Sequence, residues 1–272
     1  MKKQIELYLR TVWARAYVRI FAQFKRDINW IISSVIGAFL TMATFIYVFR
    51  SINAPEEFSG IVLLGGFMTP YWLNVLWSVA SQLYWEKEMG NLQLIVLSPA
   101  SLSAFLLGLT IGGFIHTTFR ALLVLFVGIV IFKIPIVVSS PFTLVFVFFI
   151  SIYALYSVGM MFSALFLFYG RELWRVMVLI QDPVSIISGF YFPIKVLGTT
   201  FAAIVSAIPL TLGLDALRQI LLPSYNMLFL NWKIETIILA ILGSIFLFIA
   251  LRMLVFIENL SKKEGRLTLK WQ

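Results

Sequence analysis

Apolar residues occur along this chain in blocks of about twenty or more, separated by short polar and charged stretches. A helix needs roughly 20 apolar residues to cross a bilayer, so these blocks predict membrane spans. We expect six spans, at about 29–49, 59–84, 102–132, 142–169, 176–192 and 234–256. The fifth is interrupted by Asp182-Pro183, where the missing backbone hydrogen bond predicts a kink. The predicted fold class is an all-α integral membrane protein, with a six-span domain at residues 28–256.

Residues 1–27 predict an amphipathic helix that lies in the plane of the membrane. Ile5, Leu9, Trp13 and Tyr17 recur at four-residue steps, and Lys and Arg occupy the remaining faces. Such a helix suits the headgroup region of an anionic leaflet, so membrane lipid is an expected partner. A cleaved signal peptide is the alternative, but it would need an immediate apolar core and a small-residue cleavage site, which this stretch lacks.

The second and third predicted spans are joined by residues 85–99, which combine charge, a glycine and a brief apolar run. Two carboxylates, Glu86 and Glu88, are too costly in hydrocarbon, so the chain surfaces there. Gly90 permits a sharp turn, and Pro99 closes the run. Apolar residues fall between them at helical spacing: Leu92, Ile95 and Val96. The segment at about 90–99 is too short to span, so we expect a short amphipathic helix presented to water.

Another apolar stretch that cannot span lies before the last span, at about 193–222. Residues 196–210 are mostly apolar but too few to cross, and an amphipathic stretch with Asp215 and Arg218 follows. Lipid cannot satisfy irregular backbone, so such segments are buried against protein or line a cavity. We expect a pair of short re-entrant helices here, and a cytoplasmic tail at 257–272.

The amino-acid composition favours a membrane protein and argues against a nucleic-acid-binding protein and a metal site. The chain has 272 residues, of which 61% are hydrophobic and 12% charged, with a mean hydropathy of +0.98. The net charge of +9 is spread over short clusters between apolar blocks, which is typical of cytoplasmic loops. We therefore expect no nucleic-acid partner. With no cysteine and one histidine, we also expect no metal site.

The distribution of basic residues predicts the orientation. Of the 21 Lys and Arg residues, fifteen lie on the side of the N-terminus, residues 85–99 and the tail, five on the opposite side, and Arg120 within a span. The positive-inside rule places both termini and residues 85–99 in the cytoplasm.

Common catalytic motifs are absent from the sequence. Gly-x-x-x-x-Gly-Lys-Ser/Thr, Gly-x-Ser-x-Gly and His-Glu-x-x-His do not occur. We expect no catalytic residue, no cofactor in this chain and no ATP hydrolysis by it.

Two separated motifs resemble the type 2 ABC exporter permeases. The first is Glu86-x-Glu88-x-Gly90 followed by an Asn-Leu-x-Leu-x-x-x-Ser-Pro run, with Asn91 where the family usually has Thr. The second is the order of Ser-Gly, Phe-Pro, Pro-Leu and Leu-Asp-x-Leu-Arg between Ser188 and Arg218, which looks closer to the drug-exporter branch. An ordinary amphipathic loop is the alternative for residues 85–99 taken alone.

The resemblance implies that residues 90–99 form a cytoplasmic coupling helix that docks on a separate ATP-binding subunit. That subunit would bind ATP and Mg, and a second permease copy or paralogue would complete a dimer in the plasma membrane. The polar contacts would come from Glu86 and Glu88. The residues expected to fill the partner's groove are Leu92, Leu94, Ile95 and Leu97.

The expected function is ATP-driven export of an amphipathic or lipid-like substrate by alternating access. A polysaccharide or glycolipid exporter permease is an alternative. A non-transporting integral membrane protein is the alternative from another class, although it should leave a catalytic constellation or a soluble domain.

Polar residues within spans are costly and therefore suggest function. The expected substrate route comprises Asn74, Trp77, Gln181, Asp182 and Ser185. By resemblance, an outer gate would contain Phe190, Phe192 and Pro193.

His116 and Arg120 lie one helical turn apart within the third predicted span. They either line the route or stabilise the bundle, and Arg120 is a candidate partner for Asp182. Three tryptophans in and after the second span, Trp72, Trp77 and Trp85, either contact cargo or belong to the aromatic belts at the membrane interface.

Overall fold

The structure, a computed structural model, describes residues 2–26, 28–136, 138, 140–222 and 225–264, and this part of the chain is helical without strands. The elements are α1 (Lys2–Arg26), α2 (Ile28–Ser51), α3 (Glu57–Asn74), the π-helix η1 (Val75–Ala80), α4 (Gln82–Glu88), α5 (Asn91–Leu97), α6 (Leu102–Phe132), α7 (Pro141–Tyr169), α8 (Arg171–Ile187), the 3-10 helix η2 (Ile194–Leu197), α9 (Thr199–Val205), α10 (Pro209–Leu221) and α11 (Trp232–Glu264). The predicted all-α fold is confirmed.

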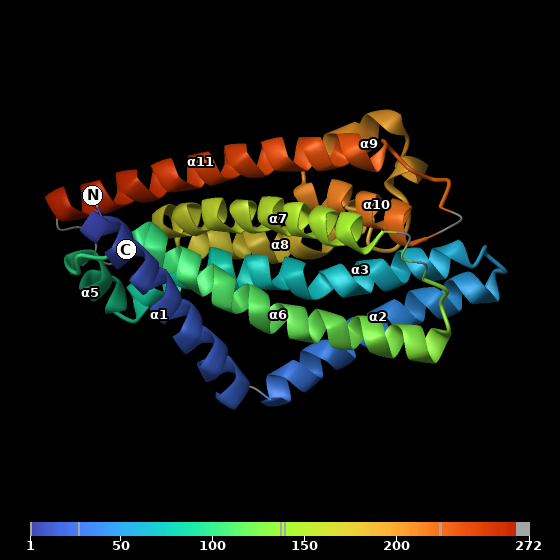
Figure 1. Ribbon diagram of the computed structural model, residues 1–272, viewed down its shortest axis with the longest axis horizontal. Helices are drawn as coiled ribbons and strands as arrows, with labels where there is room; N and C mark the ends of the chain where they lie inside the picture. The colour runs from blue at the N-terminus through green and yellow to red at the C-terminus, as the bar shows by residue number, and fades with distance from the viewer. Residues whose placement is uncertain (1, 27, 137, 139, 223–224, 265–272) are drawn as a thin grey trace.

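The long helices form a bundle whose two ends differ (Figure 1). Helices α2, α3, α6, α7, α8 and α11 run roughly along the long axis of the molecule. The start of α1, the short helix α5 and the end of α11 lie at one end, which we call the α5 end. The short helices α9 and α10 lie at the opposite end, the α10 end.

Within the part of the chain that the structure describes, five stretches are long and apolar enough to cross a membrane. They are Ile31–Ser51, Glu57–Glu88, Leu102–Phe132, Pro141–Tyr169 and Trp232–Leu260. Counting α9 and α10 together gives a sixth, but these helices are bent by 114° relative to each other. So large a bend turns the chain back and fits the predicted re-entrant pair better than a continuous crossing. The chain is a multi-pass membrane protein.

The fifth predicted span differs from the helix that the structure contains. The prediction was 176–192, whereas α8 has 17 residues, begins at Arg171 and ends at Ile187. It continues through Pro183, so the helix is not broken there. The kink expected at Pro183 stays a prediction. The chain turns after α8 at Gly189, whose φ of +83° lies in the left-handed region that glycine adopts easily. Although α8 is shorter than a typical membrane span, it runs beside α7 along the bundle (Figure 1).

The last helix is longer than predicted. Its apolar part agrees with 234–256, but α11 continues to Glu264, so residues 257–264 of the predicted tail are helical. Residues 265–272 lie outside the described residues.

Helix α1 packs closely against the first half of α6. A Cβ on Gly108 would lie 2.5 Å from the carbonyl oxygen of Val12, and one on Gly112 would lie 2.8 Å from that of Ala16. Only glycine allows backbones to approach so closely. Apolar side chains on the other face of α1 are exposed: Ile5, Leu9, Trp13, Tyr17 and Phe21.

A network of buried polar side chains closes the α10 end. Asp215 of α10 accepts hydrogen bonds from the Tyr225 hydroxyl and from Gln219 Nε2 at 3.1 Å. Gln219 Nε2 also lies 3.1 Å from Glu235 Oε2 at the start of α11. Burial is the main cause that raises the pKa of Tyr225 above its usual value. The network joins α10 to α11 across the intervening chain.

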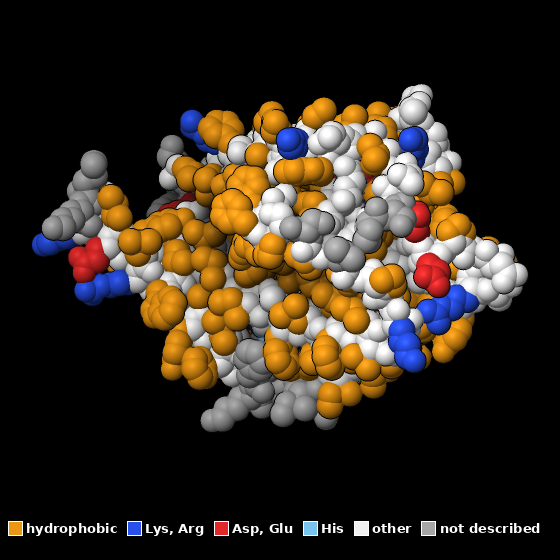
Figure 2. Space-filling model, turned by 45° about the vertical axis from the view of Figure 1, so that its right-hand side comes forward, with side chains coloured by type: hydrophobic (Ala, Val, Ile, Leu, Met, Phe, Trp, Pro, Cys, Tyr) orange, Lys and Arg blue, Asp and Glu red, His pale blue; other side chains and the backbone are white. Residues whose placement is uncertain are grey.

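The surface of the bundle is largely apolar, as expected for a protein surrounded by lipid. Figure 2 shows a face on which hydrophobic side chains predominate, with charged side chains mostly around its periphery. Large exposed apolar residues occur on α2, α6, α7 and α11, for example Leu40, Phe126, Phe142 and Phe248, whereas α3 is almost entirely buried.

Candidate functional site

The turn between α4 and α5 is built by a glycine and by side-chain hydrogen bonds. Gly90 has a φ of +77°, which ends α4 and redirects the chain into α5. Glu86 Oε2 accepts a hydrogen bond from Asn91 Nδ2 at 3.1 Å, so the carboxylate ties the first residue of α5 back to α4. At the other end, the Ser98 hydroxyl donates to the carbonyl oxygen of Ile95 at 2.7 Å. These contacts fix the position of a helix of only seven residues.

A chain of hydrogen bonds extends from this turn to α1. Arg19 Nη1 donates to Gln82 Oε1 at 3.1 Å, and Gln82 Nε2 donates to Glu86 Oε1 at 3.0 Å. Arg19 also donates to the Ser78 hydroxyl in η1. Hydrogen bonds therefore link α1 both to the π-helix η1 and to the turn that begins α5.

The two faces of α5 have different environments. Leu92, Ile95 and Val96 are buried against the rest of the bundle, with 1%, 7% and 8% of their surface exposed. Leu94 and Leu97 are 70% and 83% exposed, and Met89 just before the turn is 61% exposed. Burying a leucine side chain is worth about 1.5–3 kcal/mol, so this exposed apolar group is a strong candidate contact surface.

The structure divides the residues predicted to fill a partner's groove. Leu94 and Leu97 are accessible, whereas Leu92 and Ile95 pack inside this chain and hold α5 in place. Of the two predicted acidic contacts, Glu88 is exposed and Glu86 is half-buried in the turn.

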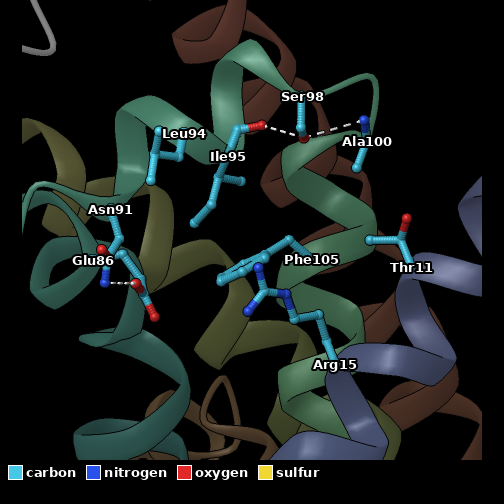
Figure 3. A pocket seen from close by; sticks show the side chains of 9 residues that line it. All are labelled: Thr11, Arg15, Glu86, Asn91, Leu94, Ile95, Ser98, Ala100 and Phe105. Atoms are coloured by element: carbon cyan, nitrogen blue, oxygen red, sulfur yellow. Dashed lines mark hydrogen bonds between the residues drawn. The ribbon is translucent and has the colours of Figure 1, made fainter.

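A cavity of about 340 Å³ lies beside α5 and is walled partly by α1 (Figure 3). Its lining residues are Thr11, Arg15, Glu86, Asn91, Leu94, Ile95, Ser98, Ala100 and Phe105. The guanidinium carbon of Arg15 lies 4.3 Å from the centre of the Phe105 ring, a cation–π contact between α1 and α6. From the sequence, α1 was predicted to lie in the plane of the membrane. No sequence pattern predicted that α1 lies beside α5.

Replacing Gly90 with Ala should destabilise the turn without causing a clash. No heavy atom lies within 4 Å of the added Cβ, so the cost is only that of a left-handed backbone, about 1–2 kcal/mol. Exposed Gly37 of α2 is the matched control, since its Cβ would also meet nothing within 4 Å and its helical φ suits Ala. We expect Gly90→Ala to increase proteolytic cleavage at 88–92 several-fold and Gly37→Ala to leave it unchanged. Equal cleavage of both variants would contradict this assignment.

Two of the predicted route residues meet between the second span and α8. The indole of Trp77 donates to Gln181 Oε1, and Gln181 Nε2 donates to Asp182 Oδ1 at 3.0 Å. The Ser185 hydroxyl donates to the carbonyl oxygen of Asp182 at 2.8 Å. Asn74 lies apart from them, buried and accepting a hydrogen bond from the Tyr156 hydroxyl at 3.0 Å.

His116 and Arg120 are buried within the bundle, with 0% and 3% of their surface exposed. Arg120 donates to the Ser34 hydroxyl of α2 at 3.1 Å and to the Thr117 hydroxyl at 3.3 Å. Asp182 is exposed on α8. These contacts favour the interpretation in which Arg120 stabilises the packing of α2 on α6.

The predicted gate residues lie at the turn that follows α8. Phe190 is fully buried, Phe192 is half-buried and Pro193 is buried. A Cβ on Gly65 of α3 would lie 1.9 Å from the carbonyl oxygen of Phe190, so the second span directly contacts this turn.

Sequence reasoning missed several residues that the structure brings together. The ring of Trp174 in α8 lies tilted against that of Trp77, and Glu235 is fully buried in the network of the α10 end. Glu235 is a carboxylate at the start of the apolar block 234–256, which is the signal that could have revealed it. Among the described residues, no group of three or more His, Asp or Glu side chains could hold a metal ion.

Comparison with known protein families identifies the class. A family model described as ABC-2 type transporter matches residues 11–222, which include α5, α8, α9 and α10. The chain therefore belongs to the ABC-2 type transporter membrane family and is a permease subunit of an ABC transporter. Such permeases are generally not enzymes and generally act with an ATP-binding subunit. Neither the curated proteins nor the solved structures yield a match to this chain.

Proposed function

We propose that this permease exports an amphipathic or lipid-like substrate from the cytoplasm, driven by a separate ATP-binding subunit that docks on α5. The observation that carries the proposal is the division of α5 into a buried face and an exposed apolar face. Leu92 and Ile95 anchor the helix, whereas Leu94 and Leu97 project from it. A push on the exposed face would be transmitted to the bundle because α5 is fixed at both ends.

The proposed orientation places the α5 end in the cytoplasm, together with both termini. The excess of basic residues on this side supports it. ATP and Mg would be bound by the partner subunit, since this chain lacks a phosphate-binding motif.

The proposed route follows the second span and α8, and a second permease copy or paralogue would cover the exposed face of α8. Only Met177 of α8 is fully buried within this chain. Movement of α5 would alternately open the route to the two sides of the membrane. The turn at Phe190 to Pro193, held against α3, would close its outer end.

Co-purification tests this proposal. The tagged full-length chain is expressed with the ATP-binding subunit encoded beside it, and the expected result is a complex in which cargo stimulates ATP hydrolysis. A permease that folds and reaches the membrane but never retains this subunit would contradict the proposal.

A further inference from the structure

We propose that the cargo is a lipophilic cation, recognised by a tryptophan cluster (Trp77, Trp85 and Trp174) and by the carboxylate of Asp182. This inference rests on the proposed function, because it names the class of substrate that would follow the route.

The tryptophan cluster joins α8 to the second span. The ring centres of Trp77 and Trp174 lie 4.7 Å apart, and those of Trp85 and Trp174 lie 5.6 Å apart with the rings nearly perpendicular. The side chains are not buried in the core: Trp85 is 43% exposed, and the other two are half-buried. They therefore present aromatic surface along the length of η1 and α4.

Asp182 continues this surface toward the middle of the bundle. It is eleven residues from the start of α8, about 16 Å along the helix axis. With the charged start of α8 at the cytoplasmic surface, as in the proposed orientation, this places Asp182 halfway across a hydrocarbon core of about 30 Å. Its side chain is nevertheless exposed, and its one side-chain donor among the described residues is the Gln181 amide. An ionised carboxylate at that depth cannot face lipid cheaply, so it requires a water-filled route or a cationic partner.

The hydrogen bonds hold the carboxylate and the rings in one unit. Gln181 accepts from the indole of Trp77 through its side chain and from the indole of Trp72 through its carbonyl oxygen at 3.3 Å. With its acceptor groups occupied by the indoles, Gln181 turns its amide nitrogen toward Asp182. The position of the carboxylate is thus coupled to the aromatic surface.

The electrostatics of this surface favour a cation. Indole faces carry negative potential and attract cations, most strongly among the aromatic side chains. The nearest basic group on α8 toward the α5 end, Arg175, is paired with Glu172 at 3.1 Å, so these charges offset each other. A cargo molecule whose apolar part stacks on the tryptophans and whose positive charge lies near Asp182 is attracted both by the indole faces and by the carboxylate. An anion is attracted by neither.

Two ions of matched size and opposite charge test the inference. Equilibrium dialysis of the purified full-length chain in neutral-detergent micelles, corrected for empty micelles, measures binding of tetraphenylphosphonium and tetraphenylborate. We expect the phosphonium to bind at least about 10-fold more tightly. Equal affinities, or tighter binding of the borate, would overturn the inference.

Variants separate recognition from folding. We expect Asp182→Asn and Trp174→Ala each to weaken phosphonium binding about 5- to 10-fold, and Asp182→Glu to retain it. Glu56→Gln, which removes an exposed carboxylate at the α10 end, should leave binding unchanged. Unchanged phosphonium binding in Asp182→Asn would refute the role of the carboxylate. So would a neutral oligosaccharide that competes with the phosphonium equally well in the native protein and in Asp182→Asn. Retention of the ATP-binding subunit is measured on the same samples, so failure here is distinguishable from failure of the proposed function.

Discussion

Leu94→Asp is expected to abolish cargo-stimulated ATP hydrolysis in the assembled transporter while leaving the permease folded. Leu94 is 70% exposed on α5, so the substitution removes little packing from this chain. In the proposed complex, the change loses about 1.5–3 kcal/mol of leucine burial and places a carboxylate in an apolar groove. Together these effects exceed about 3 kcal/mol, which corresponds to more than about 100-fold weaker association.

Two matched variants distinguish this effect from general damage. Leu94→Met keeps an apolar side chain of similar volume and should retain coupling. Leu228→Asp adds the same charge to a leucine that is 38% exposed near the α10 end and should leave the ATP-binding subunit attached. The measurements are pull-down of that subunit and ATPase activity with and without cargo. A normally coupled Leu94→Asp transporter would refute the assignment of α5.

Arg218→Ala is expected to produce the largest loss of stability in the chain. The Arg218 side chain is fully buried, and its Nη2 donates to the carbonyl oxygens of Ile61 at 3.1 Å and of Gly189 and Phe190 in the turn after α8. One guanidinium therefore links α10, the second span and the turn of the proposed outer gate. Its removal takes the donor away from the buried carbonyl oxygens of Gly189 and Phe190, at a cost of about 1–3 kcal/mol each.

Lys195 supplies the control for this prediction, because it is an exposed cation at the same end of the bundle. Lys195→Ala should leave the apparent melting temperature in detergent unchanged, whereas Arg218→Ala should lower it by several degrees or prevent folding. Arg218→Lys keeps the charge but lacks the planar group that reaches several carbonyls, so we expect an intermediate value. An Arg218→Ala protein as stable as the Lys195→Ala protein would contradict this account of the α10 end.

Much of the architecture follows from simple rules of hydrophobic patterning. Apolar blocks of twenty or more residues predicted helices close to α2, α3 with α4, α6, α7 and α11, because lipid requires continuous helices. Gly90 predicted the turn before α5, and the fifteen-residue, mostly apolar stretch at 196–210 predicted helices that do not span. These signals are local, so a single sequence is enough to read them.

Other features depend on contacts that a local pattern does not encode. The π-helix at Val75–Ala80 has no distinctive residues, and the end of α8 at Ile187 is set by the Gly189 turn and by Arg218 from a distant helix. Likewise, the burial of Leu92 and Ile95 follows from how α5 sits against the bundle. The sequence showed which residues of α5 are apolar, but only tertiary structure separates the face that anchors the helix from the face that is exposed.

Single-cysteine labelling tests most directly whether α5 faces the cytoplasm and contacts a partner. The chain contains no cysteine, so Leu97→Cys introduces a unique thiol at a position that is 83% exposed. The account predicts that a membrane-impermeant maleimide labels this thiol in inside-out vesicles but not in intact cells, and that the bound ATP-binding subunit protects it. Labelling in intact cells, or no protection by the bound subunit, would contradict the account.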